Sequence, residues 1–408
     1  MEGLRFARLV LLSALLVAGC GQQVSLPYEK WAEPEPPYSP AASSDNAYDA
    51  YARAAADVET SCAQYLDRNF FTPAMKQKCI VLMGDALSRV QRAAGRKSLF
   101  QFRTHKPGQR PPFQKGWRLL GRAMVWQIEQ AAIDGDYKTA AKRTSEAISF
   151  GFDLVGGGAL DASLGLTIVD EARGAIATSL ARMDEDALLS LKEGVTTALL
   201  SRPLLVQALE NERKNMRAAV QFVQDSMREG KWEVIQRLMG RDSKPAIDYL
   251  NQVRKDEPKR AAYFKAFAAE AKAEVDWLIE QSKLPAYKRS SQGPEDGAAE
   301  RPWRRFARHF FMTGRPLLSQ EIKTLARTRL LALHAAALYS VRINRSGLDG
   351  LESFPVMIRT DPYSGASFIY RGQGSDFRIY SVGTDCRDDG GETDESFAAP
   401  DMLLEGTR

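Results

Sequence analysis

A helical pattern of apolar residues governs most of this chain. It begins near Ala47 and continues to about residue 345, and glycine and proline residues mark its interruptions. We expect helices over residues 46–68, 73–95, 113–134, 137–155, 160–182, 185–199, 203–228, 258–283 and 319–344. Because this pattern covers most of the chain, it predicts a mainly α fold.

Two of these predicted helices, 113–134 and 137–155, have matching apolar faces. The first face contains Trp117, Leu120, Ala123, Trp126, Ile128 and Ala131, and the second contains Ala140, Ala141, Ala147 and Ile148. Gly135-Asp136-Tyr137 forms the turn between them, so this pair resembles one tetratricopeptide hairpin. A repeat array needs a period of about 34 residues, which the chain does not show clearly. We therefore expect an irregular bundle of helical hairpins, with a tetratricopeptide-like stack as the alternative.

The pattern changes near Gly350, where glycine and proline become frequent. Residues 367–371 and 377–382 alternate in the manner of strands around a short turn, which predicts a β-hairpin. Two strands alone are only marginally stable in water. We therefore expect the hairpin to pack on the helix 319–344, in a small C-terminal segment over 346–408 that ends in a disordered tail.

The N-terminus has the features of a bacterial lipoprotein signal peptide over residues 1–19. Arg5 and Arg8 precede an apolar run from Leu9 to Ala18, and small residues lead to Cys20. A membrane-spanning helix needs about 20 apolar residues, roughly twice this run, so the alternative of a helical anchor is disfavoured. Cys20 is the predicted site of lipidation, and its acyl chains would hold the mature protein on a membrane.

The signal peptide also predicts where the protein lies and how its domains follow one another. Gly21 follows the cysteine in place of an aspartate retention signal, so we expect an outer-membrane lipoprotein facing the periplasm. Prolines are frequent in residues 20–45, which predicts an extended tether. A helical domain over 46–345 and the C-terminal segment over 346–408 follow this tether.

Three cysteines remain after Cys20, in a compartment where disulfides persist. Cys62 and Cys79 lie on opposite sides of the turn between the first two predicted helices, at similar distances from it. An antiparallel hairpin would bring them together, and closing a loop of this size stabilises a protein by about 3 kcal/mol. We expect a Cys62–Cys79 disulfide, with two buried free thiols as the alternative.

The C-terminal segment carries a recognisable motif. Tyr380-Ser381-Val382-Gly383-Thr384-Asp385 is followed by Asp388-Asp389-Gly390-Gly391 and preceded by Asp361-Pro362 and Gly365. This segment resembles the C-terminus of type II secretion major pseudopilins. The same ending is found on uncharacterised helical bacterial envelope lipoproteins, with Tyr363 here in place of their phenylalanine. The chain lacks the N-terminal methylation motif and long apolar assembly helix of a true pseudopilin.

The resemblance also implies a possible calcium site, because pseudopilins of this type bind the ion near this loop. The residues that could supply its oxygen ligands are Asp385, Asp388, Asp389 and Asp394. The alternative is an acidic turn whose aspartates bond their own backbone.

No recognised catalytic motif is present. The three histidines, His105, His309 and His334, are far apart and lack the spacing of metal ligands. Gly156-Gly157-Gly158 is not followed by the lysine and hydroxyl residues of a phosphate-binding loop, so we interpret it as a loop or helix break. Acidic pairs on helices, such as Asp170 with Glu171, are typical of solvated faces.

These observations favour a binding protein over an enzyme. The net charge of +5 over 408 residues is too small to predict nucleic acid as a partner. The main hypothesis is a membrane-anchored lipoprotein that acts as a non-catalytic binding or scaffold protein for a protein partner in the cell envelope, without a cofactor other than possible calcium. The alternatives are a peptidoglycan hydrolase that uses carboxylates between helices and an accessory factor of a secretion or pilus machine.

Overall fold

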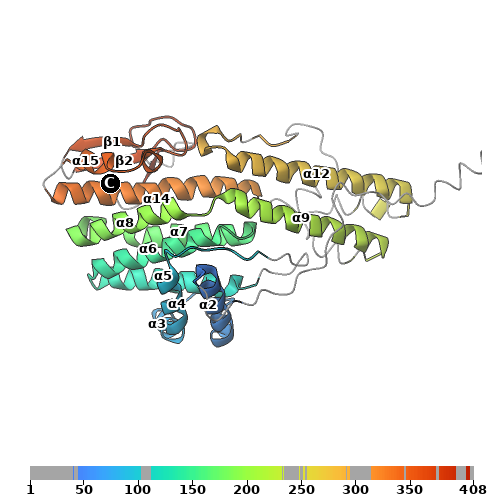
Figure 1. The fold of residues 1–408 in the computed structure, drawn as a ribbon, viewed down its shortest axis with the longest axis horizontal. Helices are drawn as coiled ribbons and strands as arrows, with labels where there is room; N and C mark the ends of the chain where they lie inside the picture. The colour runs from blue at the N-terminus through green and yellow to red at the C-terminus, as the bar shows by residue number, and fades with distance from the viewer. Residues whose placement is uncertain are drawn as a thin grey trace, which may run out of the picture.

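The computed structural model shows a mainly α protein with a small three-stranded sheet, which confirms the predicted fold class (Figure 1). The residues that it describes are 40, 45–102, 112–231, 233, 248, 251–252, 255–290, 292–294, 314–343, 346–373, 376–391 and 401–404. The predicted signal peptide with Cys20, and all of the tether except Pro40 and Asp45, lie outside them. Among the described residues, no helix is long and apolar enough to cross a membrane.

Most helices lie close to the predicted ranges, but α2 ends at Ser61, before the end of its predicted range of 46–68. They are α2 (Ala47–Ser61), α3 (Pro73–Leu82), α4 (Gly84–Ala93), α5 (Gln114–Ile133), α6 (Tyr137–Leu154), α7 (Ala159–Ala177), α8 (Glu185–Ser201), α9 (Leu205–Arg228), α12 (Glu257–Lys283), α14 (Gly314–Arg342), α15 (Gly347–Glu352) and α16 (Val356–Arg359). Within the described ranges, the short 3-10 helices η1 (Ala63–Tyr65), η2 (Leu180–Arg182) and η4 (Ala286–Lys288) follow α2, α7 and α12. The sequence did not predict α15 or α16.

Polar side chains fix where several helices begin. The side chains of Asn46, Thr72, Asp136 and Asp184 each accept a hydrogen bond from a backbone N–H in the first turn of α2, α3, α6 and α8. These bonds satisfy donors that the helix itself leaves unpaired. One prediction was wrong, because the helix expected over 73–95 is two helices. Met83 leaves the helical conformation and Gly84 starts α4.

The helices form an irregular bundle around two central members. α6 packs against α4, α5, α7 and α8, and α14 packs against α7 and α8. α9 and α12 pair with each other and extend from one end of the bundle (Figure 1). This arrangement favours the bundle over a regular tetratricopeptide-like stack, because one helix contacts neighbours on several sides instead of only its partners in a repeated series.

Glycines allow α6 and α7 to approach each other closely. A Cβ atom placed on Gly165 of α7 would lie 2.2 Å from the backbone oxygen of Gly151 on α6. Similarly, a Cβ atom on Gly121 of α5 would lie 2.5 Å from a side-chain carbon of Ile168 on α7. Side chains at these glycines would force the helices apart, so small residues determine the packing distance in the centre of the bundle.

The C-terminal sheet lies on α14, as the sequence predicts (Figure 1). Strands β1 (Ile369–Gln373) and β2 (Asp376–Ser381) form an antiparallel hairpin. β2 also pairs with β3 (Met402–Leu403), a strand within the tail that was predicted to be disordered. The rings of Phe377 on β2 and His334 on α14 lie 5.9 Å apart. The hairpin therefore gains from α14 the apolar contacts that two strands lack by themselves.

Candidate functional site

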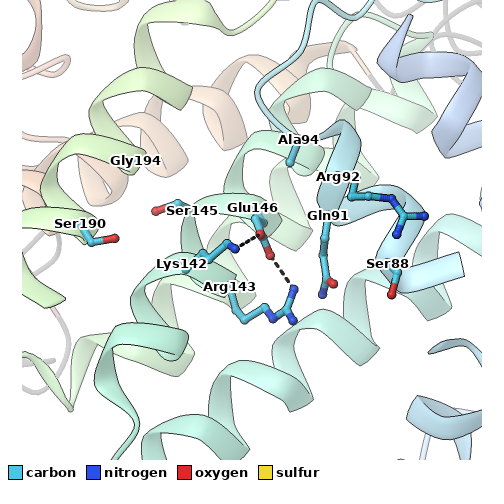
Figure 2. A pocket seen from close by; sticks show the side chains of 10 residues that line it. All are labelled: Ser88, Gln91, Arg92, Ala94, Lys142, Arg143, Ser145, Glu146, Ser190 and Gly194. Carbon is cyan, nitrogen blue, oxygen red and sulfur yellow. Dashed lines mark hydrogen bonds and ion pairs between the residues drawn. The ribbon is translucent and has the colours of Figure 1, made fainter. Parts of the chain in front are cut away.

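Three helices border an open groove on the bundle (Figure 2). α6 lies between α4 and α8, and packs against both. The groove has a volume of about 550 Å³. Its lining consists of Ser88, Gln91 and Arg92 from α4, Ala94 directly after α4, Lys142, Arg143, Ser145 and Glu146 from α6, and Ser190 and Gly194 from α8. We call this feature the α6 groove.

Close contacts at both sides set the shape of the α6 groove. On one side, a Cβ atom on Gly194 of α8 would lie 2.2 Å from the hydroxyl oxygen of Ser145, so only glycine allows α8 to pack here. On the other side, the backbone N–H of Gly95 donates a hydrogen bond of 3.1 Å to the hydroxyl of Ser149. This bond ties the end of α4 to α6. The backbone packing therefore holds the three helices in position around the groove.

The charges in the α6 groove are only partly neutralised. The Glu146 side chain is 13% exposed, and its carboxylate accepts a hydrogen bond of 2.9 Å from Arg143. The ammonium group of Lys142 lies 4.0 Å from the same carboxylate, and the Lys142 side chain is 72% exposed (Figure 2). Arg92 has no hydrogen-bond or ion-pair partner among the described residues. The lining thus contains three cations and one carboxylate.

A second cavity, between α9 and α12, has a different charge balance. Its volume is about 370 Å³, and it is lined mainly by charged side chains. Asp276 is paired with both Arg213 and Lys272, and Glu280 is paired with Lys283 at 2.7 Å. The carboxylates of this cavity already have cationic partners within it. It therefore offers less unpaired charge to a ligand than the α6 groove does.

Buried carboxyl groups surround the loop at Gly156–Gly158, which the structure confirms as the break between α6 and α7. Burial raises the pKa of Asp153 to about 7, and Tyr51 donates a hydrogen bond of 2.8 Å to it. Burial also raises the pKa of Asp161 to about 7, despite a hydrogen bond of 3.1 Å from the backbone N–H of Gly158.

Glu212 belongs to the same group of carboxyls. Burial raises its pKa, and the backbone N–H of Ala159 donates a hydrogen bond of 3.3 Å to it. Asp161 and Glu212 therefore hold the loop and the start of α7 through backbone N–H groups. Neither residue lines the α6 groove or the α9–α12 cavity. The carboxyls whose pKa is raised at this loop therefore lie apart from both cavities, where the hydrolase hypothesis would place its general acid.

His334 is a core residue of α14. Its ring is buried, and Nδ1 donates a hydrogen bond of 2.9 Å to the backbone oxygen of Leu330. Burial lowers the pKa of this imidazole to about 4. His105 and His309 lie outside the described residues.

Cys62 and Cys79 are both buried and are free thiols in the structure. Burial and, to a smaller extent, the neighbouring Cys62 thiol together raise the pKa of the Cys79 thiol to about 11. This electrostatic effect requires the two side chains to be close in space, as the predicted hairpin places them. The disulfide itself stays a prediction. Cys386 is exposed and adopts a left-handed backbone conformation with a φ angle of 59°.

The predicted calcium ligands have mainly local partners. Asp388 accepts hydrogen bonds from the Tyr380 hydroxyl at 2.8 Å and from Arg371 at 2.7 Å. These bonds and one from the Gly390 N–H keep the pKa of Asp388 below its usual value.

The other predicted ligands are not gathered around a common point. Asp385 accepts a hydrogen bond of 3.0 Å from the backbone N–H of Arg387, as the acidic-turn alternative expects. Asp389 uses its backbone N–H to bond Asp401. Asp394 lies outside the described residues, and the described part of the chain contains no group of three or more acidic, histidine or cysteine residues that could hold a metal. Calcium binding therefore stays a prediction.

The two halves of the C-terminal motif meet at Asp361. Its buried carboxylate accepts hydrogen bonds from the Ser381 hydroxyl at 2.9 Å and from the backbone N–H of Val382 at 3.1 Å. It also accepts one of 3.0 Å from the backbone N–H of Tyr363. Asp361 thus joins the loop before β1 to the end of β2. The sequence motif marked these residues but did not show that they bind each other.

The candidate functional residues that the structure adds are those of the α6 groove. They come from three helices that are distant in the sequence, and no local motif connects Arg92, Lys142 and Ser190. No protein-family model, no curated protein and no solved structure matches this chain.

Proposed function

We propose that this chain is an exported lipoprotein, anchored through acylated Cys20 to the outer membrane and facing the periplasm. Its helical body acts there as a non-catalytic binding or scaffold protein for another protein of the cell envelope. The sequence from Arg5 to Cys20 supports the anchor. It has a basic n-region, a short apolar run and small residues directly before the cysteine. Several acyl chains would give stable membrane attachment.

The α6 groove is the observation that supports a binding role. It combines unpaired cationic charge with accessible polar side chains, whereas the carboxylates of the α9–α12 cavity are paired within that cavity. Ser88 and Ser190 have no hydrogen-bond partner among the described residues. Groups of this kind gain interactions only when a ligand or water occupies the groove. A protein partner would supply such interactions in a fixed arrangement.

Position-specific photocrosslinking in intact cells tests this function. A photoreactive amino acid replaces Ser190 in the α6 groove, and a control variant carries it at Lys265, an exposed residue on α12 outside the groove. We expect the variant at Ser190 to form a discrete crosslink with an envelope protein and the variant at Lys265 to form none with that protein. Identical crosslinks from both positions, or none from Ser190, would contradict the proposed binding surface.

A further inference from the structure

The charge of the α6 groove also indicates what kind of partner it accepts. We propose that the groove binds carboxylate side chains of an acidic, extended peptide segment presented by the partner. This inference rests on the proposed binding function and adds the chemistry of the bound segment. It depends on the distribution of charge, on the position of the hydroxyl groups and on the composition of the lining.

Arg92 and Lys142 provide the available positive charge. Arg92 lies in the last turn of α4, is exposed, and has no partner among the described residues. Lys142 is only loosely associated with Glu146, at 4.0 Å. A guanidinium group can bind a carboxylate through two parallel hydrogen bonds, and an ammonium group binds one as a point charge. Two carboxylates could therefore be bound, one from the α4 side and one from α6.

Glu146 keeps Arg143, the third cation of the lining, from binding the peptide. Its carboxylate bonds Arg143 at 2.9 Å and is mostly shielded from solvent. Because this pair is already formed, a ligand meets Arg92 and Lys142 as the unsatisfied cations of the groove. An anionic segment would gain from both charges, whereas a basic segment would be repelled by them.

Polar groups on the two walls suit a peptide backbone. Ser88 lies on α4 and Ser190 lies on α8, on opposite sides of α6. Gln91 donates its amide N–H to Gln127 at 2.8 Å, which leaves its own amide oxygen free to accept a hydrogen bond. A volume of about 550 Å³ lies within the usual range of ligand sites. No aromatic residue lines the groove, so it lacks a surface on which a nucleic-acid base would stack.

Peptide binding to the soluble full-length mature protein tests the inference. The protein carries Cys20→Ser, so that membrane attachment plays no part, and the probe is a fluorescein-labelled hexaglutamate peptide. Fluorescence anisotropy measures its affinity at low salt, with hexaglutamine and hexalysine as control peptides. We expect hexaglutamate alone to bind, with an affinity that falls as salt screens the charges.

Charge-removing variants locate the binding. Each exposed ion pair contributes only modestly to binding, so loss of both cations in Arg92→Gln/Lys142→Gln should weaken binding by roughly tenfold. Lys265→Gln is the control for loss of positive charge, because Lys265 is an exposed lysine on α12 outside the α6 groove. It is compared with the single variant Lys142→Gln, which changes the total charge equally. This control should bind hexaglutamate as the parent protein does.

Several results would overturn the inference. One is the absence of hexaglutamate binding by a folded protein, verified by circular dichroism. Others are an equal loss of affinity in Lys265→Gln, or displacement of the probe by inorganic phosphate as readily as by unlabelled hexaglutamate, which would indicate a general anion site. Membrane fractionation of the unmodified chain tests the lipid anchor independently of peptide binding, and crosslinking at Ser190 tests whether a protein partner binds at all. A wrong partner chemistry is therefore distinguishable from a wrong function.

Discussion

Replacing Gly165 with alanine reverses the usual effect of this substitution in a helix. Alanine normally stabilises a helix relative to glycine, by about 1 kcal/mol. At Gly165, however, the new Cβ atom would lie 2.2 Å from the backbone oxygen of Gly151 and 3.0 Å from Cβ of Leu154. The nearest obstacle is backbone, which cannot rotate away as a side chain can. α6 and α7 would have to separate.

The size of the effect follows from these two opposing terms. Overpacking in a core costs about 1–3 kcal/mol, and contact with backbone places this substitution at the upper end. After subtraction of the helix preference, we expect a net loss of about 2 kcal/mol in the free energy of unfolding. For a helical domain of about 300 residues, with an unfolding entropy of about 2.1 cal/mol/K per residue, that loss lowers the melting temperature by about 3 °C.

Gly84→Ala is the matched control. Gly84 is also a helical glycine, at the start of α4, but no atom lies within 4 Å of the position of its Cβ. Alanine there should leave the stability unchanged or raise it by up to about 1 kcal/mol. Thermal unfolding followed by circular dichroism compares the two variants. If Gly165→Ala is as stable as the parent protein, the close approach of α6 and α7 is refuted.

The remaining predictions concern the buried carboxyls, the cysteines and the C-terminal motif. The pKa of Asp161 is raised to about 7 in the folded protein, so its contribution to stability is present at low pH and is lost as the pH rises from about 4 to about 7. Asp161→Asn should therefore reduce the decline of the free energy of unfolding over this pH range, measured by urea unfolding. A variant whose free energy of unfolding declines as steeply as that of the parent protein would contradict this. Thiol titration of the denatured, unreduced protein should detect Cys386 but neither Cys62 nor Cys79 if the predicted disulfide forms, and three reactive thiols would disprove it. Asp361→Ala should lower the free energy of unfolding by about 1–3 kcal/mol per buried donor left unpaired, and a variant of unchanged melting temperature would show that these hydrogen bonds are dispensable.

The sequence predicted the helices well because their ends carry local signals. Asp136 follows the turn glycine Gly135, and its side chain caps α6 where the apolar pattern places the start of a helix. The break at Met83 was missed, although Gly84 stood directly after it, because the apolar pattern continues through both residues. β3 was missed for a different reason, since two residues are too few to show the alternation of a strand.

The candidate site could not be predicted because helix packing creates it. Arg92, Lys142 and Ser190 are each unremarkable exposed or half-exposed residues of an amphipathic helix. They become neighbours only because α4 and α8 pack on either side of α6, and Gly194 permits the close contact on one side. The charge left unpaired in the groove likewise depends on which cation Glu146 binds, which the sequence alone does not determine.

Metabolic labelling with a palmitate analogue, combined with membrane fractionation, tests the proposed anchor most directly. The comparison is between the unmodified chain, Cys20→Ser and Cys386→Ser, which removes a different exposed cysteine as a control. We expect the unmodified chain and Cys386→Ser to be labelled and to sediment with the outer membrane, and Cys20→Ser to be unlabelled and released. An unlabelled parent protein, or a Cys20→Ser variant that stays with the membranes, would contradict the proposal of a lipid-anchored envelope protein.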